Sequence, residues 1–132
     1  MGASLSLDKS QAIARIRFEG DLTDELLFQG YARVRQWFAR DRYYSNLTDF
    51  SAVSSFQVST NAVARLAADA PLVPDGFLRI VVAPQDQAFG MARMFESLGS
   101  ATRDTVHVVR TCAEAYRLFG VASLNFDPID ES

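Results

Sequence analysis

The sequence predicts an α/β fold: a single mixed, mainly parallel β-sheet of about five strands, with an N-terminal antiparallel hairpin and about four flanking helices. Short apolar segments of strand length alternate along the chain with longer segments whose apolar residues recur at helical spacing. Those longer segments suit right-handed crossovers between parallel strands. With 132 residues, 48% of them apolar, the chain can build one core. We expect one domain over residues 1–120 and a loosely held acidic tail over 121–132.

The chain begins with two segments typical of an antiparallel hairpin. Residues 3–7 alternate weakly, and residues 8–11 form a polar turn. Residues 12–18 then place apolar side chains on one face and arginines on the other. Gly20 is expected to break this second strand. A helix is expected over 23–40, because apolar residues recur there at helical spacing.

The central stretch, residues 44–67, is the most informative part of the chain. It predicts an interior strand that ends at Asp49, a serine-rich loop, and a second helix that begins at Ser59 or Thr60. Pro71 ends that helix. Open α/β sheets usually place functional residues between the carboxyl end of a strand and the following helix, so function is expected here.

The remaining elements continue the alternation. The apolar run 77–83 is typical of an interior strand covered on both faces, and Pro84 ends it. A third helix is expected over 85–98 and a final strand over 105–109. A fourth helix follows the cap at Thr111.

Composition and charge exclude several classes of function. The net charge is −3 and the arginines are scattered, so the chain lacks the basic surface that nucleic-acid binding requires. Its one cysteine, Cys112, cannot form an intramolecular disulfide, which favours a reducing compartment. No apolar run approaches the roughly 18 residues of a membrane span, and the first residues do not resemble a signal peptide. We therefore expect a cytoplasmic protein without a transmembrane segment.

Side chains able to attack a substrate or move protons are few. The one histidine, His107, alternates with valines in the last predicted strand, a position typical of a structural or solvated side chain. Cys112 follows the cap, where a helix amino end can depress a thiol pKa, although a small first-turn residue is the simpler interpretation. The sequence contains neither metal-ligand spacing nor a glycine-rich phosphate loop. We expect no enzyme activity, metal or cofactor.

Hydroxyl groups gather around the start of the second helix. Ser59 and Thr60 are candidates for a phosphorylation or anion site, because the free amides of a helix amino end favour negative charge. The alternative is that one of them only caps the helix. Asp49 is expected to accept amide hydrogen bonds from Ser51 and Ala52. The predicted interaction loop carries Asp49, Ser51, Ser54, Ser55 and Gln57.

Four apolar side chains are candidates for a pocket or a dimer face, since adaptable methionines suit both. They are Phe56, Met91, Met94 and Phe95. Met91 and Phe95 fall on the apolar stripe of the third helix, so we expect them in the core. Met94 lies off that stripe and is the candidate for the surface.

Two motifs resemble the STAS domain, the sulfate-transporter and anti-sigma-factor-antagonist module, and in particular its SpoIIAA-like branch of small stand-alone bacterial proteins. Residues 49–53, D-F-S-A-V, are similar to the strand-end motif D-L-S-G-V of that family. Residues 18–23, F-E-G-D-L-T, are similar to its v-x-G-x-L-T entry to the first helix. The resemblance covers most of residues 10–120 in element order, so residues 1–120 are expected to be a single STAS-like domain.

The resemblance implies a mixed sheet flanked by helices, no catalytic machinery, and docking to a partner protein. It also implies a switch by phosphorylation of a serine at the start of the helix after the central strand. In anti-sigma antagonists this loop is similar to D-S-S-G, whereas residues 57–60 here are Q-V-S-T. Ser59 keeps the phosphorylatable position, and the other three residues differ. Some relatives in the broader group are likened to lipid-carrying domains with an apolar cavity.

We therefore expect a non-enzymatic regulatory or protein-interaction domain that acts through the loop and helix from Ser51 to Asn61. Its partner is an unidentified protein, and a homodimer is one candidate assembly. The alternative is a small apolar ligand or lipid-binding module with a pocket between sheet and helix. That pocket would be lined by Phe56, Met91, Met94 and Phe95.

Overall fold

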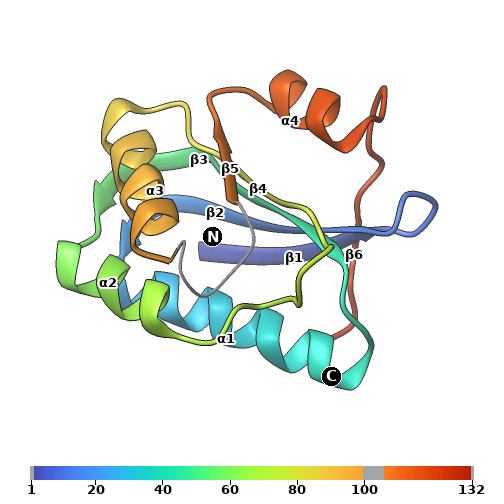
Figure 1. Cartoon of the computed structure of the whole chain (residues 1–132), viewed down its shortest axis with the longest axis horizontal. Helices are drawn as coiled ribbons and strands as arrows, with labels where there is room; N and C mark the ends of the chain where they lie inside the picture. Colours follow the sequence, from blue (N-terminus) through green and yellow to red (C-terminus); the bar gives the residue numbers. More distant parts are fainter. Residues whose placement is uncertain (1, 100–105, 132) are drawn as a thin grey trace.

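The computed structural model describes residues 2–99 and 106–131 (Figure 1). Its strands are β1 (Gly2–Asp8), β2 (Ile13–Thr23), β3 (Ser45–Gln57), β4 (Arg79–Val82), β5 (Val106–Val109) and β6 (Asp127–Pro128). Its helices are α1 (Asp24–Arg40), α2 (Thr60–Ala68), α3 (Asp86–Gly99) and α4 (Cys112–Phe119). Position 105, which we expected at the start of the last strand, lies outside the described residues.

The predicted α/β class is confirmed. The strands form one mixed sheet in the order β5-β4-β3-β2-β1-β6. β1 and β2 form the expected antiparallel hairpin, and β2, β3, β4 and β5 run parallel to one another. Within the described residues, none of the helices has the length and apolar character needed to cross a bilayer.

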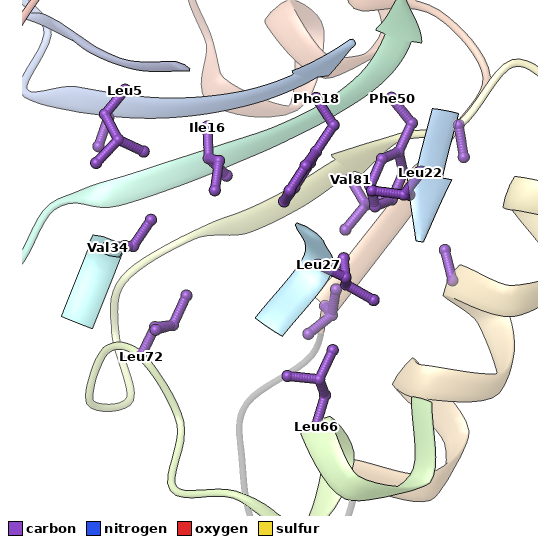
Figure 2. Close-up of a cluster of buried hydrophobic side chains, with 14 of the residues drawn as sticks. Leu5, Ile16, Phe18, Leu22, Leu27, Val34, Phe50, Leu66, Leu72 and Val81 are labelled. Atoms are coloured by element: carbon purple, nitrogen blue, oxygen red, sulfur yellow. The ribbon is translucent and has the colours of Figure 1, made fainter. Parts of the chain in front are cut away.

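The sheet separates two apolar clusters, because its helices are divided between its faces (Figure 1). The larger cluster lies between the sheet and α1, α2 and α3. Figure 2 shows Phe18, Phe50 and Val81 of the strands pointing toward Leu27 of α1 and Leu66 of α2. Burial of each such side chain stabilises the fold by about 1.5–3 kcal/mol. The smaller cluster, on the α4 side, contains Leu47, Ile80, Val82 and Ala115.

The central strand is longer than predicted. β3 does not end at Asp49 but continues to Gln57, and residues 51–57, expected to be a loop, pair with the end of β2. Gly20 does not break β2, because it adopts a φ of 76° within the strand, and β2 runs on to Thr23. β3 takes one extra residue at each of two register shifts, so β-bulges accommodate its irregular, serine-rich sequence.

The C-terminal segment makes several contacts with the domain. Residues 121–132 are predicted to be a loosely held tail; within the described part of this tail, β6 forms the edge of the sheet by pairing with β1. Arg33 of α1 donates two hydrogen bonds to the Glu131 carboxylate, of 2.8 and 2.6 Å. The Asp8 carboxylate accepts the backbone N–H of Asn125 at 2.7 Å. Glu131, one of the acidic residues that indicated a solvated tail, is therefore a hydrogen-bond partner of α1.

Candidate functional site at the carboxyl end of β3

The second half of β3 extends beyond the neighbouring strand. β4 pairs with β3 only as far as Val82, which lies opposite Asp49. Residues 50–57 therefore have β2 on one side and, among the described residues, no strand on the other. Pro84 follows β4 and its ring nitrogen carries no N–H for a further ladder bond. The end of β3 thus stays paired with β2 but extends beyond β4 toward the amino end of α2.

Gln85 occupies the space beside this projecting strand. Its side-chain Nε2 donates hydrogen bonds to the backbone oxygens of Phe50 and Val53, at 3.1 and 2.9 Å. Its Oε1 is buried and accepts no hydrogen bond from the described residues. A buried acceptor left unsatisfied costs roughly 1–3 kcal/mol, so this atom is a place where a donor would bind favourably.

A groove of about 350 Å³ runs along this edge. Three predicted interaction residues line it, namely Ser54, Ser55 and Gln57. The other lining residues are Val53, Phe56, Gln85 and Gln87. The Ser55 hydroxyl donates to Asp21 at 2.7 Å and accepts from Gln57 Nε2 at 3.0 Å, so neighbouring groups fix its orientation. Every residue of the lining is uncharged, which suits a backbone or an amide better than an ion.

Ser59 is the N-cap of α2, which confirms the prediction that Ser59 or Thr60 caps this helix. Its Oγ accepts the Ala62 N–H at 3.1 Å. The same hydroxyl donates to Asp24 at 2.7 Å, and the Ser59 backbone N–H donates to the other oxygen of that carboxylate, also at 2.7 Å. These bonds, the backbone one first, lower the pKa of Asp24. Thr60 is the first residue of the helix and is exposed.

Asp49 and Ser51 do not share the groove. Asp49 is 2% exposed and lies in the middle of β3 rather than at its end. Its carboxylate accepts the Ser51 N–H at 2.9 Å, which confirms the first of the two predicted hydrogen bonds. Asp49 lies near Arg15 and Cys112, on the α4 side of the sheet. Ser51 itself is exposed.

The predicted apolar pocket is present only as a small cavity. Phe56, Met91 and Phe95 line it together with residues of α1, α2 and the sheet, whereas Met94 does not. Its volume is about 30 Å³. That volume accommodates about two water molecules, whereas ligand pockets measure about 300–1,000 Å³. The observed side-chain packing therefore leaves no room for a lipid.

A larger, open hollow of about 660 Å³ lies where the C-terminal segment crosses the ends of β1 and α1. Its lining includes the basic residues Lys9 and Arg40 as well as several aspartates. Arg40 donates to the backbone oxygens of Asp130 and Glu131, so it holds the C-terminal segment in place. We assign this hollow to that attachment.

The candidate nucleophile and base lie away from the groove. Cys112 occupies the first turn of α4, and burial, followed by the nearby Asp49 carboxylate, raises the pKa of its thiol. This direction is opposite to the one that activates a cysteine. His107 is half-buried in β5, opposite Ile80. Within the part of the chain that the structure describes, no three His, Cys, Asp or Glu residues gather as a metal site would require.

No protein-family model matches the sequence, and none of the curated proteins does. The STAS resemblance therefore remains a prediction that rests on two motifs and the order of elements.

Three residues of the candidate site were not predicted from the sequence: Asp24, Asp21 and Gln85. The sequence showed Asp24 only as an acidic residue in the first turn of a helix, which is common and does not indicate a contact with Ser59. Gln85 gave no signal, because its partners lie more than 30 residues away.

Proposed function

We propose that this chain is a non-enzymatic, STAS-like regulatory domain that binds a partner protein through the segment from Ser51 to Asn61. The observation that carries the proposal is the projection of this segment beyond β4, with much of its polar surface facing solvent. The exposed side chains of the segment are those of Ser51, Ser54, Gln57, Ser59, Thr60 and Asn61.

The chemistry of this surface favours binding. Serine and threonine hydroxyls and glutamine amides donate and accept hydrogen bonds, but they do not attack a substrate unless a base activates them. The surface is also preorganised, because the strand pairs with β2 and Ser59 is fixed by Asp24. A preorganised surface loses little conformational entropy when a partner binds.

Ser59 is the residue at which such binding could be switched. A phosphate on its hydroxyl would carry about two negative charges and would replace the donor that Asp24 now accepts. The phosphate and the Asp24 carboxylate would repel each other, since the two oxygens are now 2.7 Å apart. Phosphorylation would then change the charge of the surface and separate the start of α2 from the start of α1.

The test is affinity purification from the native cell with four forms of the full chain, followed by mass spectrometry. The forms are wild type, Ser54→Arg, Ser59→Asp and Ser123→Asp. Ser123 is exposed and lies outside the segment, so it controls for the added charge. We expect a protein captured by wild type and Ser123→Asp, lost with Ser54→Arg and captured in a clearly different amount with Ser59→Asp, while circular dichroism shows all four folded. Equal capture by all four forms would refute the proposal.

A further inference from the structure

We propose that the open edge of β3, residues 50–57, accepts an extended segment of a partner protein as an added β-strand, and that it prefers a segment carrying lysine or arginine. This inference rests on the proposed function and specifies how the partner is recognised. A strand edge without a neighbour presents backbone N–H and C=O groups that can pair with another chain. The argument depends on the length of the edge, the role of Gln85, and the charge around the groove.

The open edge is long enough to hold a strand. The pairing with β4 stops at Asp49, Gln85 then caps the carbonyls of Phe50 and Val53, and the free part of the edge runs from Ser54 to the end of β3 at Gln57. Alternate residues of a strand direct their backbone groups to the same side, so part of this segment directs them away from β2. Strands in proteins usually have about three to ten residues, and the free edge of residues 54–57 lies at the short end of that range.

Gln85 already makes hydrogen bonds of the kind that an added strand would make. Its Nε2 donates to the carbonyl oxygens of Phe50 and Val53, as the backbone N–H groups of a neighbouring strand would. Its Oε1, buried beside the same groove, has no donor among the described residues. A backbone N–H of a bound peptide can supply that donor once the glutamine side chain turns its oxygen toward the groove, because this oxygen is covered in the free protein. The amide therefore continues the sheet at the start of the edge and offers an acceptor for the next chain.

The groove beside the edge has the space and polarity that a peptide requires. Its volume is about 350 Å³, and its lining consists of serine, glutamine, valine and phenylalanine side chains. Peptides added to a sheet edge obtain affinity from main-chain hydrogen bonds and specificity from alternate side chains. An uncharged lining leaves the specificity to charged groups at the rim.

Carboxylates adjoin the segment that lines the groove, although the lining itself contains none. Asp21 accepts the hydroxyl of Ser55, Asp24 holds Ser59, and Asp86 lies between the two glutamines of the lining. The one cation observed with these carboxylates is Arg110, which pairs with Asp86 at 2.7 Å, among the described residues. A segment with lysine or arginine would neutralise the remaining negative charge. A second copy of this chain would bring the same carboxylates to the same edge, so a basic peptide is the better partner.

The test uses synthetic peptides of about eight residues that alternate threonine with lysine, acetylated and amidated at their ends. A matched peptide carries glutamate in place of lysine, and a third carries N-methyl groups on alternate backbone nitrogens of the lysine peptide. We expect the lysine peptide to bind wild-type protein at least about tenfold more tightly than either control. N-methylation removes the strand hydrogen bonds without changing the charge. Equal binding of the N-methylated peptide would overturn strand addition.

Two further measurements locate the peptide. Amide hydrogen exchange should slow within residues 50–57 when the lysine peptide is bound. The exchange of the Ile129 amide should be unaffected, because this amide bonds to Leu5 near the opposite edge of the sheet. Protection elsewhere without protection of 50–57 would refute the inference. Gln85→Met, similar in size but without amide groups, should weaken peptide binding at least about fivefold. The hydrogen-exchange experiment uses wild-type protein, so its result is valid even if Gln85→Met is unstable.

The outcomes separate this inference from the proposed function. Partner capture that depends on Ser54 or Ser59, together with equal binding of the N-methylated peptide, would keep the proposed function and refute strand addition. Peptide binding with protection of residues 50–57, together with capture unaffected by those substitutions, would keep strand addition and refute the proposed function. A third outcome is that the lysine peptide does not bind, sedimentation shows self-association, and hydrogen exchange shows that this self-association protects the same amides. The edge would then bind a second copy of this chain and not a basic peptide.

Discussion

Ser59 and Asp24 join the amino ends of two helices through a pair of hydrogen bonds, each 2.7 Å long. Asp24 is the first residue of α1, and Ser59 is the N-cap of α2. One carboxylate thus receives both the backbone N–H and the hydroxyl of the residue that starts the second helix. The alternatives predicted for Ser59, helix cap and modifiable surface residue, are compatible, because the hydroxyl that caps α2 is exposed.

The cap at Ser59 should contribute measurably to stability. Ser59→Ala removes the acceptor of the Ala62 N–H and one of the two donors to Asp24, so we expect the free energy of unfolding to fall by about 1 kcal/mol. Thr60→Ala is the matched control at the next position, and its effect should stay within about 0.5 kcal/mol. Urea denaturation followed by circular dichroism measures both. Equal losses for the two variants would show that Ser59 does not act as the cap in solution.

The Asp24 contact should depend on pH. Its hydrogen bonds from Ser59 hold the Asp24 pKa below the ordinary value of 3.8. The contact therefore stabilises the folded state fully above pH 3.8, and this contribution is lost as the pH falls through the folded pKa. We expect Asp24→Asn to be less stable than wild type near pH 6, and the difference to shrink near about pH 2.5. A difference that is the same at both pH values would contradict the assignment.

Gly30 should be required by the approach of α1 to β2. A Cβ at Gly30 would lie 2.6 Å from two ring carbons of the buried Phe18 and 3.0 Å from Ile16. Gly30→Ala is therefore expected to destabilise the protein by about 1–3 kcal/mol, although alanine is the better helix former. Gly90 of α3 has open space around the same position, so Gly90→Ala should stabilise by about 0.5–1 kcal/mol. Thermal unfolding of both variants tests the contrast, and stabilisation by both would refute it.

The C-terminal segment should be released when its ion pair with α1 is removed. Arg33→Gln breaks the double contact with Glu131, which is partly exposed, so we expect a loss of about 0.5–1 kcal/mol. The loss should be local, and the Ile129 amide, bonded to Leu5 on β1, should exchange up to about fivefold faster. Arg93→Gln, which breaks a pair within α3, is the control and should leave this amide unchanged. Unchanged exchange in Arg33→Gln would show that β6 holds the segment without the ion pair.

The sequence by itself determined the class of fold and the local boundaries of its helices. The apolar runs predicted the sheet, and helical spacing predicted the four helices that cover it. The caps at Ser59 and Thr111 were predictable because an N-cap hydroxyl bonds to an amide only three residues along the chain. For the same reason Asp49 could be assigned its hydrogen bond from Ser51.

Only the tertiary structure decided what becomes of the polar segments. The stretch 51–57 has a composition typical of a loop, and it becomes a strand because the end of β2 lies alongside it. Asp24 meets Ser59, and Gln85 meets Phe50 and Val53, across more than 30 residues of sequence. Such contacts form when the whole chain closes around its core, and no local pattern encodes them. The sequence thus indicated the candidate functional region, whereas long-range hydrogen bonding gave that region its open edge and groove.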